Sequence, residues 1–199
     1  MSNGTPSPAP APPAPPEKIV YINFFSKIDD ASANKFMTIC AEIIKAENPT
    51  TLYFLFASPG GSVDAGIAIY NYLRALPVKL VMHNNGSIDS IANVIFQAAD
   101  ERHAAPHASF LFHGVAMGLE KVNLNRSQIQ ELLSQIKALE DKIGKILSER
   151  CQLTIAEVQA LFLNGETKDT DFATAKGIVQ SVTQPVIPKD AKFCSLNFS

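Results

Sequence analysis

Two side chains in this sequence, Ser90 and His113, could together carry out nucleophilic catalysis. Ser90 lies at or just before the start of a predicted helix, after Gly86-Ser87-Ile88-Asp89. A serine there can cap the helix, or it can be a nucleophile that points into a cleft beside amides able to bind an oxyanion. His113 ends the apolar run Phe110-Leu111-Phe112. A histidine at a strand end can be structural, or it can be the general base that a serine nucleophile needs at neutral pH.

A third candidate element is the turn Ser58-Pro59-Gly60-Gly61-Ser62. It follows the apolar run 52–56, which predicts a buried strand, and it precedes a helical pattern over 63–76 that Ser62 could cap. Two glycines between a strand and a helix leave backbone N–H groups unshielded by side chains. Such amides can bind a phosphate, a carboxylate or a developing oxyanion. The turn therefore predicts an anion site without identifying the anion.

Alternating strand and helix patterns would position these residues. Apart from the elements around the turn, strand patterns cover 18–25, 78–82, 109–113 and 178–182, and helix patterns cover 31–47, 90–99, 127–150 and 172–176. This alternation predicts an α/β fold with parallel strands and right-handed crossovers. Sites in such sheets lie beyond the carboxyl ends of the strands. We therefore expect the Gly-Gly turn, Ser90 and His113 at one rim.

Finer signals mark the ends of these elements. Asp29 or Asp30 could cap the first helix, and Thr154 could cap a short helix before the last helical pattern. Asn84-Asn85-Gly86 indicates a turn. Helix 127–150 carries an apolar stripe that packs on the core or on another chain, formed by Ile129, Leu132, Leu133, Ile136, Leu139, Ile143, Ile146 and Leu147.

The composition limits the function classes. The chain has 199 residues, of which 46% are apolar, as expected for one domain with a core. Its 17 Lys+Arg against 19 Asp+Glu give no sign of a nucleic-acid-binding surface. No apolar run is long enough to span a membrane. The 3 cysteines are widely spaced, which argues against a disulfide framework or a metal site and favours the cytoplasm.

The proline-rich start of the chain defines the expected domain limits. Residues 1–17 are rich in proline and alanine and predict a disordered or polyproline-II tail. Such a tail can be a flexible spacer, or it can have a docking or gating role. The globular domain is expected at residues 18–185, with a C-terminal tail at 186–199.

Two stretches resemble the Clp protease proteolytic subunit (ClpP) family of the ClpP/crotonase superfamily. They are Phe56-Ala57-Ser58-Pro59-Gly60-Gly61-Ser62-Val63-Asp64-Ala65-Gly66-Ile67-Ala68-Ile69-Tyr70 and Ala105-Pro106-His107-Ala108-Ser109-Phe110-Leu111-Phe112-His113. The likeness extends from Ile19 to Val182. It implies an α/β fold of the ClpP/crotonase type, a spiral of parallel β-α units with helix 127–150 as a protruding handle.

The resemblance also implies roles for individual residues. Ser90 matches the family's nucleophile and His113 its general base, while the oxyanion-hole amides match Gly61 and Ile91. The interval from Ser90 to His113 (113 − 90 = 23) is about two residues shorter than in the family. The missing residues fall near 100–103, away from both side chains. No metal or organic cofactor is implied.

The third member of the triad is where the chain departs from the family pattern. Gly165 stands where the orienting aspartate belongs. Glu166, or alternatively Asn164, could hold His113 in the correct tautomer if the loop shifts by one residue. Asp89, next to Ser90, is a second departure. Its carboxylate could favour protonated His113, repel an oxyanion, or cap the following helix.

These expectations lead to one favoured function and two alternatives. The favoured function is a serine endopeptidase that hydrolyses peptides or unfolded proteins inside a chamber of self-associated rings, with a tetradecamer as one candidate assembly and an AAA+ unfoldase as a candidate partner. The segment Gly114-Val115-Ala116-Met117-Gly118 would line the substrate groove and add substrate as an extra strand. The alternatives are a weak or inactive ClpP-like structural or regulatory subunit, and a crotonase-type acyl-CoA enzyme.

Overall fold

The computed structural model describes residues 17–118 and 123–195. The predicted N-terminal tail therefore lies outside the described residues except at residue 17. The strands are β1 Ile19–Phe25, β2 Thr51–Ser58, β3 Lys79–Asp89, β4 Glu101–Ala104, β5 Ser109–Phe112, β6 Glu166–Lys168, β7 Ser181–Val182 and β8 Lys192–Ser195. The helices are α1 Asp30–Glu47, α2 Val63–Arg74, α3 Ala92–Phe96, α4 Arg126–Arg150, α5 Ile155–Asn164 and α6 Thr170–Ala175.

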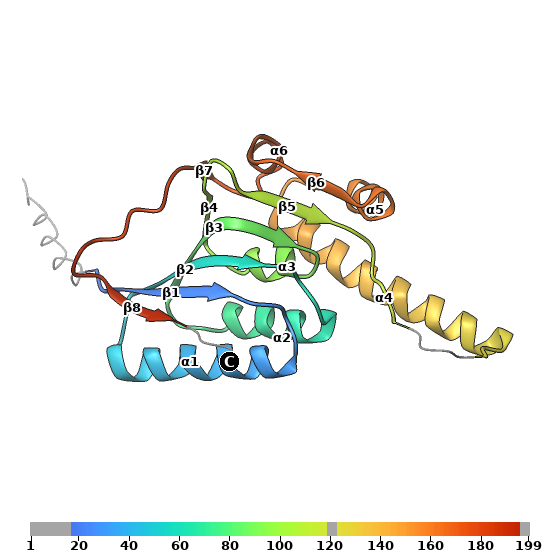
Figure 1. Ribbon diagram of the computed structural model, residues 1–199, viewed down its shortest axis with the longest axis horizontal. Helices are drawn as coiled ribbons and strands as arrows, with labels where there is room; N and C mark the ends of the chain where they lie inside the picture. The colour runs from blue at the N-terminus through green and yellow to red at the C-terminus, as the bar shows by residue number, and fades with distance from the viewer. Residues whose placement is uncertain (1–16, 119–122, 196–199) are drawn as a thin grey trace, which may run out of the picture.

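A largely parallel sheet forms the centre of the molecule. Within the described residues it runs in the order β6-β5-β3-β2-β1-β8, with β4 paired to both β3 and β7. Helices α1, α2 and α3 lie together on one side of it (Figure 1). Among the strand pairs of the described residues, only β5 and β6 are antiparallel. The predicted α/β class with parallel strands is therefore confirmed.

The core lies between this sheet and the helices. Phe24 of β1 and Phe56 of β2 stack with ring centroids 5.0 Å apart, and Phe36 of α1 meets Phe24 edge-on at 5.3 Å. All three side chains are fully buried. Parallel strands covered on both faces bury nearly every residue, and β2 does so along its length. This packing holds the end of β2, and hence the Gly-Gly turn, in a fixed place.

Strand β3 is longer than the sequence predicts. The expected turn at 84–86 is wrong, because β3 continues to Asp89. Its first half pairs with β4 and its second half with β5. The buried Asn84 side chain sits where the partner changes: its Nδ2 donates to Ser109 O at 2.9 Å and its Oδ1 accepts from Gly86 N at 3.0 Å. Side-chain bonds that satisfy the backbone here let a turn-like sequence remain in a strand.

The C-terminal part of the chain adds structure on both sides of the sheet. The predicted strand at 178–182 is reduced to β7, Ser181–Val182. Strand β8 lies within the segment expected to be a tail and pairs with β1 in parallel. At the other edge, β6 pairs with β5 so that Phe112 lies opposite Glu166.

Helix α4 extends away from the body of the molecule (Figure 1). Its buried residues are Ile143, Gly144 and Leu147, all in the C-terminal half. Ile129 and Leu133, farther out on the predicted apolar stripe, are 46% and 61% exposed. The outer half of the stripe therefore does not pack on the described part of this chain.

Several predicted helix caps are confirmed. Asp29 caps α1 in a capping box with Ser32, Ser62 caps α2, and Thr154 caps α5 in a capping box with Glu157. Within the described residues no helix has the length and apolar character needed to cross a bilayer.

Candidate active site

The Gly-Gly turn packs tightly against Ile28, which follows β1, and against the end of β3. Gly60 and Gly61 have φ angles of +80° and +143°, in a region that suits only glycine. A Cβ on Gly61 would lie 2.0 Å from Ile28 O, and one on Gly60 would lie 2.6 Å from Asp89 O and 2.7 Å from Ser90 Cβ. The turn is fixed by bonds from Ile28 N to Gly60 O and from Ser62 N to Ile28 O, each 2.8 Å. The glycines therefore bring the turn against Ser90.

Ser90 has a strained backbone between β3 and α3. Its φ is +56°, in the left-handed region that non-glycine residues rarely adopt. The expected helix 90–99 is shorter: α3 covers 92–96, its N-cap is Ile91, and no side chain caps it. The capping role considered for Ser90 and for Asp89 is therefore wrong. A serine on a strained strand-to-helix turn is the arrangement that presents a nucleophile in other hydrolases.

Backbone donors are available beside Ser90. Within the described residues, neither Gly61 N–H nor Ile91 N–H donates a hydrogen bond. Gly61 is adjacent to the residue that contacts Ser90 Cβ, and Ile91 directly follows the serine. Free amides on both sides of a nucleophile can stabilise a developing oxyanion.

The predicted strand 109–113 ends one residue earlier, so that His113 directly follows β5, which lies beside the Ser90 turn. Ser90 N donates to Leu111 O at 2.9 Å, two residues before the histidine. His113 Nδ1 lies 2.8 Å from Gly114 O. A carbonyl only accepts, so Nδ1 carries the proton and Nε2 is left as the basic nitrogen. Within the described residues no hydrogen bond joins Ser90 Oγ and His113, and such bonds are often long before substrate binds.

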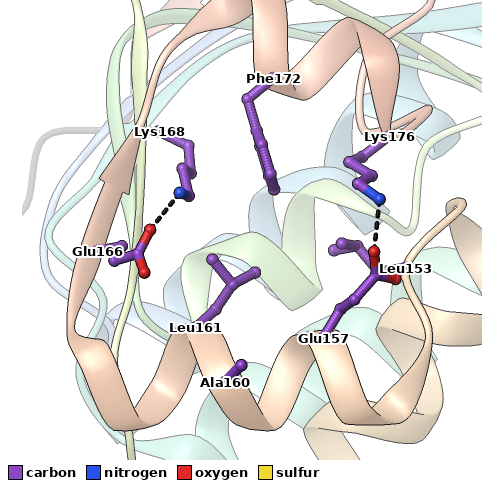
Figure 2. Close-up of a pocket in the computed structure, with 8 residues that line it drawn as sticks. All are labelled: Leu153, Glu157, Ala160, Leu161, Glu166, Lys168, Phe172 and Lys176. Atoms are coloured by element: carbon purple, nitrogen blue, oxygen red, sulfur yellow. Dashed lines mark hydrogen bonds and ion pairs between the residues drawn. The ribbon is translucent and has the colours of Figure 1, made fainter.

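The expected third member of the triad lies elsewhere. The Glu166 carboxylate accepts from Asn164 Nδ2 at 2.7 Å and pairs with Lys168. These bonds, the one to Lys168 first, hold the pKa of Glu166 below its ordinary value. Figure 2 shows Glu166 turned toward Lys168 of the same strand, both at the wall of a small cavity of about 190 Å³. Both residues considered for orienting His113 thus bond to each other.

Gly165 provides no side chain at the position next to the base. Continuing the β5–β6 register by one residue beyond the Phe112–Glu166 pair places Gly165 opposite His113. Gly165 is the left-handed C-cap of α5, with φ +62°. The acceptor that His113 meets is a main-chain carbonyl, which no residue type in the sequence announces.

The Asp89 side chain bonds to a hydroxyl of its own strand. Its Oδ1 accepts from Ser87 Oγ at 2.5 Å, and Ser87 Oγ accepts from Ser109 Oγ at 3.1 Å. This chain of hydroxyls ties β3 to β5. Within the described residues the Asp89 carboxylate thus bonds to Ser87, and no hydrogen bond joins it to His113.

The segment after His113 is held by neighbouring helices. Gly114 N donates to Phe162 O at 3.2 Å, and Val115 N donates to Glu140 Oε1 at 3.1 Å. The part described, up to Gly118, forms no strand. Its use as a substrate-binding strand stays a prediction.

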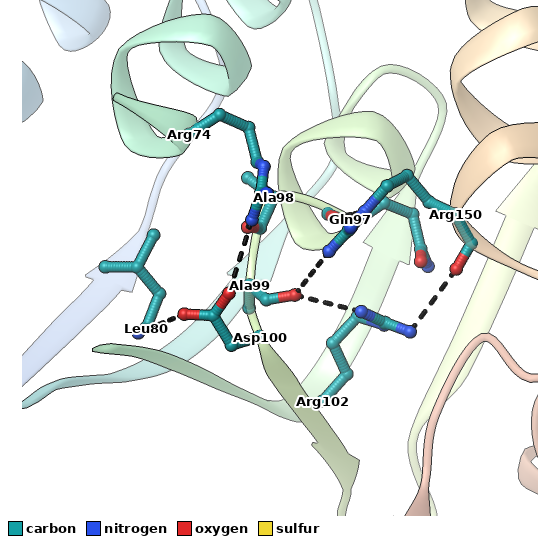
Figure 3. A network of polar contacts seen from close by, with 8 residues as sticks. All are labelled: Arg74, Leu80, Gln97, Ala98, Ala99, Asp100, Arg102 and Arg150. Atoms are coloured by element: carbon teal, nitrogen blue, oxygen red, sulfur yellow. Dashed lines mark hydrogen bonds and ion pairs between the residues drawn. The ribbon is translucent and has the colours of Figure 1, made fainter. Parts of the chain in front are cut away.

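Three arginines bond to the backbone just after the C-terminal end of α3. Arg74 donates to Ala98 O, while Arg102 and Arg150 both donate to Ala99 O (Figure 3). Arg102 is 5% exposed and burial lowers the pKa of its guanidinium. Cations at carbonyls just beyond the C-terminal end of a helix are stabilising. This support could not be predicted from the sequence, because isolated arginines form no pattern.

Comparison with known proteins identifies the family. Residues 17–186 match the family model for Clp protease. The chain is 33% identical over 160 residues to the ATP-dependent Clp protease proteolytic subunit 2 of Corynebacterium diphtheriae and 30% identical over 160 residues to that of Corynebacterium efficiens, in each case covering 78% of this chain and 72% of the relative. It is 28% identical over 147 residues to the subunit of Chlorella vulgaris, covering 71% and 69%. These matches, on the expected α/β fold, show that the chain belongs to the Clp protease family and is a ClpP-like serine peptidase.

Proposed function

We propose that Ser90 is the nucleophile and His113 the general base of peptide-bond hydrolysis. His113 Nε2 takes the proton as Ser90 Oγ attacks the carbonyl carbon, and it returns that proton to the leaving amine. In the second half of the reaction His113 Nε2 takes a proton from water, which attacks the acyl group, and then returns that proton to Ser90 Oγ as the acyl group leaves. The observation that carries this proposal is the strained Ser90 turn, packed between the Gly60-Gly61 turn and β5, the strand that His113 directly follows.

The amides of Gly61 and Ile91 would bind the oxyanion that forms during attack. Two observations support this role. Neither N–H group donates a hydrogen bond within the described residues, and Gly61 follows the glycine that packs against Ser90 while Ile91 follows Ser90 in the sequence. Losing one such donor typically lowers kcat by about 10²–10³. This preorganised pair is what makes a weakly oriented base sufficient for some catalysis.

In this proposal the carbonyl of Gly114 takes the orienting part, and Glu166 and Asn164 do not. The 2.8 Å contact to Nδ1 keeps the proton on that nitrogen. A neutral carbonyl stabilises the imidazolium less than a carboxylate does. We therefore infer a slow peptidase that works with a serine–histidine pair.

Assembly and location extend the proposal. The exposed outer half of α4 supports self-association into rings that stack through this helix, with a tetradecamer as the candidate. The relatives' name, ATP-dependent protease subunit, supports an AAA+ unfoldase as the partner that delivers unfolded proteins. Cys40, Cys151 and Cys194 are free thiols, which supports the cytoplasm as the location.

Peptide hydrolysis by the assembled protein tests this function. We expect cleavage of unstructured peptides by the wild type, and its loss in Ser90→Ala and His113→Gln, which keep the fold. A fluorophosphonate should label the wild type at Ser90 and not label Ser90→Ala. Correctly assembled wild type that neither cleaves nor becomes labelled would support the alternative, a structural or regulatory subunit, which the absence of a carboxylate at His113 Nδ1 in the described residues favours.

A further inference from the structure

A buried amide one turn beyond the nucleophile holds three carbonyls of the site. Asn93 is 2% exposed, in the otherwise apolar helix α3. Its Nδ2 lies 3.3 Å from Ile88 O, 3.1 Å from Ser90 O and 2.9 Å from Leu111 O. Three surrounding carbonyls can be met only by a donor, so the orientation of this amide is set by its surroundings.

These carbonyls belong to both halves of the candidate site. Ile88 and Ser90 lie on the strand and turn that carry the nucleophile, and Leu111 lies two residues before the base. Leu111 O also accepts from Ser90 N at 2.9 Å, and Ser90 O also accepts from Asn93 N at 3.1 Å. One side chain therefore bridges the strands that bear Ser90 and His113.

The donor side of Asn93 is what distinguishes it from the other buried amide of this region. The side-chain oxygens of Asn93 and Gln97 are both buried without a hydrogen-bond partner within the described residues, so this unfavourable feature is common to both. Only the Nδ2 of Asn93 meets carbonyls on both sides of the candidate site. Strained backbones persist only where their surroundings over-determine them. The donor side of Asn93 meets such a backbone, at Ser90 with φ +56°.

We propose that Asn93 is a positioning residue for Ser90: its amide holds the left-handed serine against β5, so that Oγ faces His113 and the two free amides. This inference rests on the proposed function in that it assigns Ser90 as the nucleophile. A displacement of the nucleophile by about 1 Å is enough to lower a rate by about 10². Loss of the clamp should therefore lower reactivity while leaving peptide binding nearly intact.

The test compares two buried amides of the same helix region in the full-length, assembled protein. Asn93→Leu removes the clamp at similar volume. Gln97→Met is the matched control, because Gln97 is also fully buried but its amide lies 3.5 Å from Ile178 O, remote from Ser90. We expect fluorophosphonate labelling of Ser90 to slow by about 10- to 100-fold in Asn93→Leu, with the KM for peptide within about 2-fold of wild type. Labelling of Gln97→Met should stay at the wild-type rate, even if its Tm falls by as much as the Tm of Asn93→Leu.

Other outcomes overturn the inference. An unchanged labelling rate in Asn93→Leu, or equal slowing in both variants in step with Tm, would mean that Asn93 is only a packing residue. Asn93→Ala provides the milder change if the leucine variant does not fold. If wild-type Ser90 is not labelled, the proposed function fails, and crystal structures of Asn93→Ala and Gln97→Met decide the clamp separately. Ser90 leaving the left-handed region only in Asn93→Ala supports it, and Ser90 keeping φ near its wild-type value contradicts it.

Discussion

Ser90 occupies a conformation that its own side chain disfavours. A non-glycine residue in the left-handed region costs about 1–3 kcal/mol. Bonds to Leu111 O and from the Asn93 backbone and side chain hold it there. At the level of single residues, we propose that this strained backbone presents the Ser90 hydroxyl to the free amides of Gly61 and Ile91. It also presents the hydroxyl to His113, whose tautomer is set by Gly114 O.

Replacing Gly165 by aspartate should strengthen catalysis. Gly165 lies opposite His113 in the continued register, a Cβ there has no described atom within 4 Å, and aspartate tolerates positive φ. A carboxylate at the histidine stabilises the imidazolium formed in the transition state. We expect kcat/KM for peptide to rise by at least about 10-fold, measured on the assembled protein.

The pH profile of this variant has a defined direction. A carboxylate beside the imidazole favours its protonated form, and the reaction needs the neutral base. The acid limb of the kcat/KM profile should therefore move to higher pH in Gly165→Asp. Gly165→Asn, which has the same shape without the charge, should leave the limb in place. A lower rate with Gly165→Asp than with Gly165→Asn would contradict our inference that a side chain at position 165 faces His113.

Residue types predicted some of this site and not the rest. The Gly60-Gly61 turn, Ser90 and His113 follow from glycine, serine and histidine at strand ends; the structure packs the turn against Ser90 and bonds Ser90 N to Leu111 O, two residues before His113. The contact of Nδ1 with Gly114 O could not be predicted, because a main-chain acceptor exists at every residue. Asn93 did carry a signal, as an amide inside an apolar helical run.

At the element scale, α3 is held at both ends. Ser90 and Ile91 lie at its start, and carbonyls 97–99 beyond its end accept from arginines of α2, β4 and α4. Arg102 reaches farthest, with Nε on Ile178 O at 2.9 Å and Nη1 on Ala99 O at 2.9 Å. A short helix with few turns gains its fixed position from such bonds rather than from its own length.

Replacing Arg102 by methionine should destabilise the domain. The change strands buried carbonyls that the guanidinium now satisfies, so we expect the free energy of unfolding to fall by about 3 kcal/mol. Arg74→Met is the control: the Arg74 pair with Asp100 is about half exposed, and we expect a loss below about 1 kcal/mol. Urea unfolding of both variants measures the difference. Equal losses would show that the buried position of Arg102 is not what matters.

The lengths of elements were harder to predict than their existence. Strand β3 runs through Asn84-Asn85-Gly86 because the Asn84 side chain satisfies the backbone where β3 exchanges partners, and that partner exchange depends on β4 and β5. Strand β8 forms because β1 leaves an open edge in the sheet. Both depend on contacts between distant segments, which local patterns do not encode.

At the scale of the whole molecule, a polar network joins the sheet to the C-terminal segment. Tyr53 O–H donates to His83 Nδ1 at 2.7 Å, and His83 Nε2–H donates to Thr183 O at 2.9 Å. His83 is fully buried. Burial lowers the pKa of His83, more than the bond to the Thr183 carbonyl raises it, and nearby His103 lowers it further.

This pKa shift gives the stability of the domain a pH dependence. A histidine whose pKa is lower in the folded state contributes stability that is complete above its unfolded pKa of about 6.5, and that is lost as the pH falls through the folded pKa. The Tm of the wild type should therefore fall more steeply below about pH 6.5 than that of His83→Gln, whose amide keeps both bonds and does not titrate. His107→Gln, at an exposed position, should follow the wild type. Parallel curves for wild type and His83→Gln would contradict this assignment.

The overall architecture was accessible from the sequence because alternation of strand and helix leaves few topologies open. The parallel core from β1 to β5 and the projecting α4 agree with that expectation (Figure 1). The antiparallel β6 at the edge was not predicted, since 3 residues carry too short a pattern. Gly165, which stands where the resemblance places the orienting aspartate, directly precedes this edge strand.

A crystal structure of the assembled protein with a peptide boronate would show directly whether Ser90 is the nucleophile. We expect a covalent bond from Ser90 Oγ to boron, with one boronate oxygen about 2.7–3.1 Å from Gly61 N and Ile91 N and His113 Nε2 facing the serine. A boronate bound to another residue, or bound to Ser90 with its oxygen turned away from both amides, would contradict this expectation.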